Sequence, residues 1–390
     1  MGNIYLMEPL LPEEGQHPEL IDLSTELIAK ASSLAARLHP LVAESIGELV
    51  RSMNCYYSNL IEGHNTHPRD IDRALMGDFS KTHKKRALQL EAKAHIDLQK
   101  KIDEGKILFS LDSHFLCTLH REFCSQLPEE LLWVENPDTQ MSLLLEPGCF
   151  RKSHVQIGQH IPPAPKEIPA FMNRFEKAYS LKHSHKIRRI IAVAASHHRF
   201  LWIHPFLDGN GRVARLFSHA FLLHLGIGST LWSVSRGLAR NVNSYKAHLR
   251  QADSARHGDL DGRGNLSAKG LVSFCHFFLE TCLDQIIYMD SLIEPSMLSR
   301  RIERHIEEEV AAGHLHKGSF SLLREALLQG QIERGKAATI TGYQERQART
   351  ILNKLVEKGL LSSHTPKGPV TLGFPLVVLE NWFPKLYPEM

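Results

Sequence analysis

The sequence predicts a mainly α-helical protein with one small β-hairpin in its middle and a mixed α+β module at its C-terminal end. Apolar residues recur at helical spacing through most of the 390 residues. Prolines and glycines gather between Leu127 and Pro169, and the segments with β-like alternation lie there and near the C-terminus. With 43% hydrophobic and 23% charged residues, the chain can bury sizeable cores.

Helices are expected before the middle region. The pattern is clearest over Glu44–Glu62, where Gly63 provides a stop and the apolar stripe consists of Ile46, Leu49, Val50, Met53, Tyr57, Leu60 and Ile61. Two further helices are expected over residues 86–101 and 111–126.

The middle region, Leu127 to Pro169, is expected to be irregular apart from one hairpin. The stretch HVQIGQHI (154–161) alternates polar and apolar residues around Gly158, which predicts a small β-hairpin. Helices then resume at about residues 168–180, 186–202, 212–225, 243–253 and 271–292.

The tail from about Arg301 has its own pattern. It predicts helices over 321–329, 333–340 and 344–358, and then LLSSHTPKGPVTLGF, two short strands joined by a Pro-Lys-Gly turn. This order of helix, helix-turn-helix and hairpin resembles a winged-helix module. We therefore expect three domains: 1–105, an N-terminal helical region; 106–295, a central helical domain; and 300–390, a winged-helix-like domain.

Composition excludes few partners but indicates a compartment. The net charge of +3 is too close to balance to argue for nucleic acid or membrane binding. No apolar run reaches the roughly 18 residues of a membrane helix, and the N-terminus has no signal-like core. The six cysteines form no CxxC pair, which predicts reduced thiols in a cytoplasmic protein; they are Cys55, Cys117, Cys124, Cys149, Cys275 and Cys282.

One short stretch, IHPFLDGNGRVAR (203–215), carries the chemistry. Gly209 and Gly211 permit a tight turn and a close approach to the backbone. Helical residues follow from Arg212, so the free N–H groups at the helix start would form an anion-binding nest.

Charged residues flank this nest. Arg212 and Arg215 are three residues apart, and arginine is well suited to grip phosphate oxygens. Asp208 is a single hard carboxylate, and one carboxylate together with substrate phosphates is a common way to hold Mg²⁺.

A titratable residue precedes the nest. His204 ionises near neutrality, as a general base should, and Pro205 favours an extended backbone for it. Phe206 is expected to anchor the loop. Together these residues predict a nucleotide site for phosphoryl or nucleotidyl transfer.

Competing motifs fail. GNGRVA matches a degenerate dinucleotide-binding fingerprint, but no acid occurs between Asp208 and Asp253, where that fingerprint needs one. The sequence contains no Walker-type GxxxxGK[ST] loop. The stretch 259–270 has Arg263 and Gly270 at positions where a calcium loop needs ligands.

HPFLDGNGRVAR resembles the signature HxFx[DE]GNGRxxR of the Fic family at every specified position. The stretches PGCFR (147–151), HVQIGQHIPPAP (154–165) and AASHHRFLWIHPF (194–206) are also similar to the family, so the resemblance covers about residues 40–290. It implies a Fic helical bundle that transfers AMP from ATP to Ser, Thr or Tyr hydroxyls of a target protein or of the chain itself.

The resemblance implies a role for each motif residue. His204 would deprotonate the target hydroxyl, and Asp208 would hold Mg²⁺. The remaining positions would contact ATP phosphates: Gly209, Asn210 and Gly211 through backbone amides, and Arg212 and Arg215 through side chains. Outside the motif, Tyr245 would lie against adenine. A flap would pin the target backbone by β-augmentation; its residues are Val155, Gln156, Ile157 and Gly158.

A second match concerns control. SNLIEG (58–63) resembles the family's inhibitory motif [ST]xxxE[GN], and Ser58 and Glu62 share one helix face. The resemblance implies that Glu62 pairs with Arg215 and takes the place meant for the γ-phosphate.

Several alternatives stay open. Fic relatives also transfer phosphate or phosphocholine or remove AMP, and a winged-helix regulator could sense nucleotide without turnover. His197 and His198 are expected to be structural. The last tail helix mixes acids with Arg346, Arg349, Lys354 and Lys358, which favours a solvated or packing surface over a DNA-reading one. A protein target or a second copy of the chain is the partner we expect there.

Overall fold

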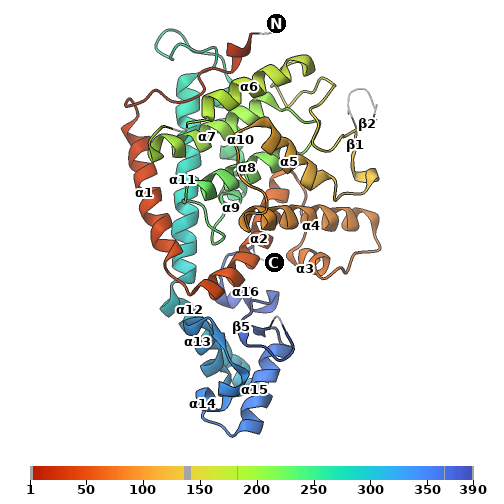
Figure 1. The fold of residues 1–390 in the computed structure, drawn as a ribbon, viewed down its shortest axis with the longest axis vertical. Coiled ribbons are helices and arrows are strands. Elements are labelled where there is room, and N and C mark those ends of the chain that lie inside the picture. Colours follow the sequence, from red (N-terminus) through yellow and green to blue (C-terminus); the bar gives the residue numbers. More distant parts are fainter. Residues whose placement is uncertain (1–2, 136–141, 182, 364, 389–390) are drawn as a thin grey trace. The chain divides into compact units, whose positions relative to one another are not determined.

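The computed structural model describes residues 3–135, 142–181, 183–363 and 365–388. As predicted, the chain is mainly α-helical (Figure 1). The helices before the tail are α1 (Pro18–Ala35), α2 (Pro40–Ile61), α3 (Pro68–Leu75), α4 (His83–Asp103), α5 (Ser113–Cys124), α6 (Ile168–Tyr179), α7 (Lys186–Ile203), α8 (Asn210–His224), α9 (Val234–Arg240), α10 (Val242–Asp253) and α11 (Ala268–Ile293).

The predicted helices are confirmed to within a few residues at most ends, and α1, α3 and α9 are additions. Both α1 and α3 begin at a proline, where a missing N–H costs nothing. α3 has only 8 residues and Pro68 as its first, with the His67 side chain accepting a hydrogen bond from the Arg69 N–H. So short a segment carries too few periodic apolar positions to be predicted from pattern alone.

In the middle region, the strands form at other residues than those predicted. A two-stranded antiparallel sheet forms from β1 (Trp133–Glu135) and β2 (Ser142–Leu144), which the sequence did not predict. The predicted hairpin at 154–161 is reduced to one tight turn, closed by two hydrogen bonds between the backbones of Ile157 and His160 at 2.9 and 3.0 Å. Polar-apolar alternation over eight residues indicates an extended backbone but does not supply a partner strand.

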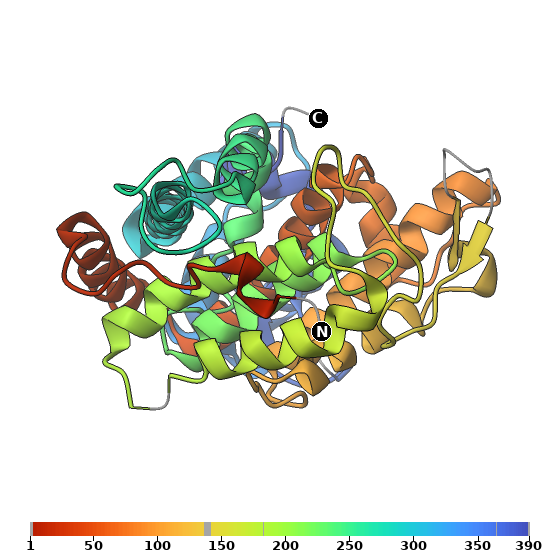
Figure 2. The same cartoon turned by 90° about the horizontal axis from the view of Figure 1, so that it is seen from above.

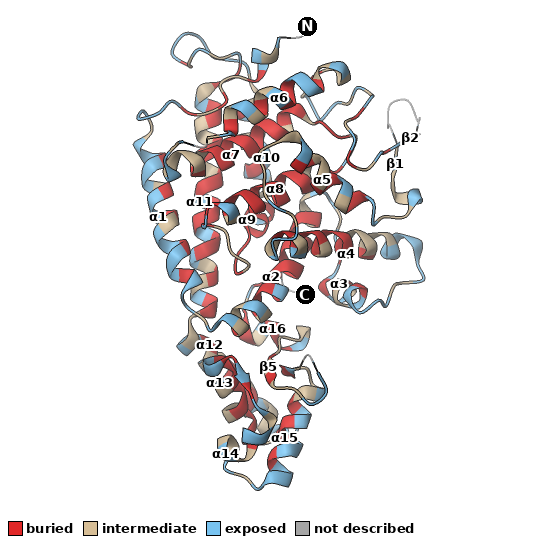
Figure 3. Cartoon of the chain, in the orientation of Figure 1, coloured by how far each residue is buried: buried red, intermediate tan, exposed pale blue. Residues whose placement is uncertain are grey.

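The core of the site-bearing part is the pair α7 and α8, which pack side by side (Figures 1 and 2). Most residues of both helices are buried (Figure 3). α6 covers α7, while α4 and α5 pack against α8. A helix pair buried this thoroughly holds the loop between its members, residues 204–209, in one place.

α11 bears on the expectation that the chain has no membrane-spanning segment. It is long and apolar enough to cross a membrane by length and composition, although no such segment was expected. Within its most apolar window, 56% of the helix is buried inside the protein. Core helices of soluble proteins show the same combination.

The chain divides into two compact units. The first contains residues 1–31, 54–229 and 233–285, and the second contains 32–53, 230–232 and 286–390. The expected boundary between 105 and 106 therefore lies inside the first unit, and the three-domain division stays a prediction.

The second unit carries the tail elements. They are α12 (Pro295–Ala311), α13 (Ser319–Gln329), β3 (Gln331–Ile332), α14 (Ala337–Thr341), α15 (Glu345–Glu357), β4 (Leu361–Ser362), β5 (Val370–Leu372) and α16 (Leu376–Trp382). The helices predicted over 321–329 and 344–358 and the hairpin are present, whereas the helix predicted over 333–340 is a 3-10 turn at 334–336 followed by the short α14. β3, α12 and α16 are additions. β5 lies between β3 and β4 in an antiparallel sheet, with Ile332 opposite Val370 and Leu361 opposite Leu372.

Candidate functional site

The loop between α7 and α8 is framed by two left-handed residues. His204 ends α7 with φ 49°, and Gly209 precedes α8 with φ 80°. A histidine in this conformation costs roughly 1 kcal/mol, so its surroundings must hold it there. α8 begins at Asn210, two residues before the predicted Arg212, because the Asn210 side chain accepts the Phe206 N–H at 3.0 Å and donates to the Phe206 carbonyl at 2.9 Å.

Phe206 anchors the loop against α5, as expected. Its buried ring stacks on His120 of α5 with centroids 4.0 Å apart. His120 Nδ1 accepts the Gly148 N–H at 2.8 Å, so its Nε2 carries the proton and donates to the Asp208 carbonyl at 3.2 Å. His120 thus fixes the loop backbone, and no sequence pattern pointed to it.

His204 is kept neutral. Burial, together with the nearby charge of Arg151, lowers the pKa of His204 to about 4. The expectation that His204 ionises near neutrality is therefore wrong for this structure. The ring is neutral at physiological pH and can accept a proton, but its lowered pKa makes it a weaker base than a free imidazole.

Arg151 joins the flap region to the loop. Its guanidinium donates to the carbonyls of His204, Ser153 and Pro163 at 2.8, 2.9 and 2.6 Å, and its own N–H donates to the Pro205 carbonyl at 2.9 Å. Burial lowers the pKa of Arg151 to about 10. The sequence contained this residue in PGCFR but assigned it no role.

The flap residues lie in the open. Gln156, Ile157 and Gly158 are exposed, and Val155 is half-buried. The Gln156 side chain donates to the Gly158 carbonyl at 2.9 Å, and His160 Nε2 lies 2.7 Å from the Trp202 carbonyl, which ties the turn to the end of α7. The flap thus presents exposed backbone from an anchored turn.

Arg215 is held by Ser58 and Glu62, which lie at the end of α2. The ion pair expected between Arg215 and Glu62 is present, with Nη2 to Oε1 at 2.6 Å. The Arg215 side chain also donates to the Ser58 hydroxyl and carbonyl at 2.9 and 3.1 Å. Burial alone would raise the pKa of Glu62, but the charges of Arg215 and Arg212 outweigh it and hold that pKa below its ordinary value.

Glu62 lies against the start of α8. A Cβ atom added at Gly211 would collide with Glu62 Oε1, so only glycine leaves room for the carboxylate. The first four N–H groups of a helix have no partner within it and attract anions. The Glu62 carboxylate therefore lies beside the backbone that the sequence predicts to receive a phosphate.

Arg212 has a different set of partners. It is buried, with Nη2 3.1 Å from Asp208 Oδ2 and Nη1 3.2 Å from Glu91 Oε1 of α4. Its guanidinium lies 4.9 Å from the ring centre of Phe123. Glu91 also contacts His64, the residue that follows the motif SNLIEG. The sequence analysis assigned no role to Glu91 or His64. The position of His64 directly after the inhibitory motif could have indicated that it belongs to the site.

Tyr245 lies next to Arg215. Its buried hydroxyl is 2.7 Å from His197 Nε2, and His197 Nδ1 is 2.8 Å from the Ser218 hydroxyl. His197 therefore has the structural role expected of it. Because Tyr245 is buried, contact with an adenine would need a neighbour to move, and that assignment stays a prediction.

The donor set fits a magnesium ion shared with a substrate. Asp208 presents a hard oxygen on a side chain that is 57% exposed, directly before α8. Among the described residues, no group of three or more His, Cys, Asp or Glu side chains could hold a metal ion alone. A site of one carboxylate, completed by phosphate oxygens and water, matches how Mg²⁺ is usually held.

Comparisons with known proteins identify the region. The Fic/DOC family model matches residues 110–222. A protein adenylyltransferase Fic of Nematostella vectensis is 26% identical over 252 residues, which cover 62% of this chain and 53% of that protein. Its Drosophila melanogaster namesake is 39% identical over 82 residues, 21% of this chain and 17% of that protein. The chain thus spans about half the length of the first of these relatives and less of the second.

Two solved structures share the fold. A Fic family protein from Desulfovibrio desulfuricans G20 has a TM-score of 0.54 at 18% identity, covering 93% of this chain and 98% of that one. A Fic domain containing signaling protein from Bacteroides thetaiotaomicron has a TM-score of 0.52 at 20% identity, covering 68% and 96%. At these identities the likeness shows the fold alone.

Proposed function

We propose that this chain, which carries a Fic/DOC-family domain at residues 110–222, is a protein adenylyltransferase held in a self-inhibited state. One observation carries the proposal. Within the matched segment, a neutral histidine and the N-terminus of α8 meet in one loop, with two buried arginines on the first turns of that helix.

The chemistry follows from these positions. His204 accepts the proton of a target hydroxyl, whose oxygen then forms a bond to the α-phosphorus of ATP as the bond to pyrophosphate breaks. The N–H groups at the start of α8 and the side chains of Arg212 and Arg215 stabilise the charge on the phosphate oxygens. The chain thus contributes one proton acceptor, the two positive charges of Arg212 and Arg215, and the partial positive charge at the start of α8.

Mg²⁺ would be held by Asp208 and would neutralise charge on the phosphates when bound. Its exposed carboxylate next to the helix start supports this assignment. The flap residues 155–158 would add a strand-like contact to the target backbone, which their exposure and anchoring by Arg151 support.

Glu62 supplies the inhibition. Its carboxylate engages Arg215 and lies against Gly211, which is the space proposed for the γ-phosphate. ATP bound beside Glu62 would be displaced from in-line geometry, and small displacements cost large factors in rate.

The proposal also covers location and partners. All six cysteines are free thiols, which supports the cytoplasm. We assign the tail module, residues 300–390, as winged-helix-like and expect it to contact a protein target or a second copy of the chain. On or near α15, Lys354 pairs with Glu357 and Lys358 with Glu309, which favours protein contact over DNA.

Intact-protein mass spectrometry after incubation with ATP and Mg²⁺ tests the activity. We expect Glu62→Gly to gain AMP and the wild type to gain little. His204→Ala in the Glu62→Gly background should gain none while keeping its circular dichroism spectrum. A gain of phosphate would instead support a phosphotransferase, loss of AMP from a premodified protein a de-AMPylase, and no change in Glu62→Gly a nucleotide sensor.

A further inference from the structure

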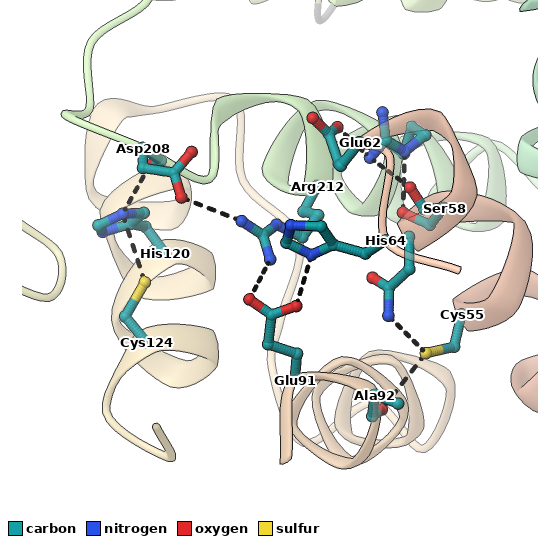
Figure 4. Close-up of polar contacts among 12 residues, drawn as sticks. Cys55, Ser58, Glu62, His64, Glu91, Ala92, His120, Cys124, Asp208 and Arg212 are labelled. Carbon is teal, nitrogen blue, oxygen red and sulfur yellow. Dashed lines mark hydrogen bonds and ion pairs between the residues drawn. The ribbon is translucent and has the colours of Figure 1, made fainter. Parts of the chain in front are cut away.

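Glu91 is a largely buried carboxylate that contacts Arg212, one of the two proposed phosphate-binding arginines. The mechanism above assigns it no role. It lies on α4 and its side chain is only 13% exposed. One oxygen, Oε1, lies 3.2 Å from Arg212 Nη1, and the other, Oε2, lies 2.7 Å from His64 Nδ1 (Figure 4). Glu91 therefore bridges a proposed phosphate-binding arginine and the residue next to the inhibitory motif.

His64 is fixed to the end of α2. Its backbone N–H donates to the Asn59 carbonyl at 2.9 Å, and the Gly63 N–H donates to the Leu60 carbonyl at 3.0 Å. These bonds close the last turn of the helix that carries Ser58 and Glu62. A movement of the end of α2 that withdraws Glu62 from Arg215 would therefore move His64 as well.

Arg212 depends on its carboxylates. It is buried. Its Nη1 and Nη2 lie 3.2 and 3.1 Å from the carboxylates of Glu91 and Asp208, and its Nε has no hydrogen-bond partner among the described residues. The ion pairs to Asp208 and Glu91 therefore set its position. Removal of either carboxylate would leave the buried charge of Arg212 only partly compensated, which is strongly destabilising.

We propose that Glu91 is a positioning residue for Arg212 and that its bond to His64 forms a second latch on the end of α2. The inhibitory helix is then held at two arginines, directly through Glu62 and indirectly through His64 and Glu91. This inference deepens the proposed function and rests on it. The competing explanation is that Glu91 only balances the charge of Arg212, with the His64 contact incidental.

The latch is tested by rates of AMP incorporation from radiolabelled ATP. We expect His64→Ala to raise the rate of the otherwise wild-type chain about threefold, the size expected of a partly exposed ion pair. In the Glu62→Gly background the same change should add nothing, because the group that blocks the site is already gone. His114→Ala, which removes an exposed histidine from α5, is the matched control and should change neither rate.

The positioning role is tested separately with Glu91→Gln in the Glu62→Gly background. We expect the KM for ATP to rise about tenfold, because an arginine left without its carboxylate no longer points at the phosphates. Glu26→Gln, at an exposed position of α1, is the control. An unchanged KM, or an equal effect of His64→Ala in both backgrounds, overturns the proposal.

A pH profile adds a signature that packing alone would not give. The hydrogen bond that His64 donates to the Glu91 carboxylate raises the pKa of His64, and the charged groups facing His64 are Glu91, Glu62 and Arg212. The charged imidazole forms the stronger latch, so the latch is complete below about pH 6.5, the ordinary value, and weakens as pH rises through the folded-state pKa. The wild-type rate, divided by that of Glu62→Gly, should rise across that window, and His64→Ala should abolish the rise.

Hydrogen exchange separates the failure of this inference from that of the proposed function. His64→Ala should speed exchange of the amides of residues 62–64 whether or not the protein transfers AMP, and His114→Ala should not. If Glu62→Gly is inactive, the proposed function fails while the latch is still tested. Unchanged exchange in His64→Ala overturns the latch itself.

Discussion

His204 combines a left-handed backbone with a neutral ring. The Arg151 guanidinium and the Phe200 carbonyl hold its backbone, with the His204 N–H donating to Phe200 at 3.0 Å. Burial excludes the charged form of the ring. Both properties come from residues outside the loop, so the surrounding fold sets the conformation and the charge of His204 before any substrate arrives.

This environment predicts an unusual pH dependence. In Glu62→Gly, which lacks the inhibitory carboxylate, the rate of AMP transfer should change little between pH 6 and 8 on account of His204. It should fall as pH drops through about 4, where the imidazole becomes protonated and can no longer accept a proton. Initial rates across the pH range, with circular dichroism to verify folding, check this. Half-maximal activity near pH 6.5, tracking His204, would show an ordinary histidine instead.

At the scale of elements, the site is a meeting of three helices and an anchored turn. α8 supplies the helix start and both arginines, α2 supplies Glu62 and Ser58, and α4 supplies Glu91. The flap joins them through Arg151, which donates to three carbonyls. Arginine is suited to this task because its planar fork carries five donors.

Replacing Arg151 should separate flap function from nucleotide binding. Arg151→Lys keeps the charge but cannot reach all three carbonyls, so buried acceptors lose partners and the free energy of unfolding should fall by about 2 kcal/mol. In the Glu62→Gly background, labelling of a protein target should fall while the Kd for ATP stays the same.

Denaturant unfolding and calorimetric titration with ATP measure these two effects of Arg151→Lys. Lys152→Arg, one residue further along at an exposed position, is the control. Equal losses of ATP binding and target labelling would mean that the contacts of Arg151 to the loop also position the ATP-binding residues, and would contradict a separate role in the flap.

At the scale of the whole molecule, the proposed chemistry belongs to one compact unit. The motif 203–215, the inhibitory residues 58–62 and Glu91 all lie in the first unit, whereas 286–390 lie in the second. The second unit has its own core, which includes Leu352, Leu355 and Val370.

This separation predicts independent responses to mutation. Leu355→Ala removes a fully buried side chain from α15 and should lower the stability of the second unit by about 2–5 kcal/mol. In the Glu62→Gly background, self-labelling below the unfolding transition should be unchanged. Scanning calorimetry and labelling rates check both statements. A parallel loss of labelling would show that the site depends on the second unit.

The sequence predicted most of the long helices, because each buries an apolar stripe whose period is visible within the helix itself. It did not predict α1, with 18 residues, or α12, with 17 residues. It missed α3 and the β1–β2 sheet for physical reasons. The first is too short to show a period, and the two strands have only three residues each. The hairpin at 154–161 was overestimated, because alternation does not supply a partner strand.

For the site, the sequence by itself determined the contiguous part: the turn, the start of α8, and the order of histidine, acid and arginines. Those features are local, since they depend on residues within one turn of one another. Only the tertiary structure decided the rest: that His204 is neutral, that His120 and Arg151 hold the loop, and that Glu91 joins Arg212 to His64. Those features arise where segments far apart in the chain pack together, and burial and charge depend on every neighbour that the fold brings near.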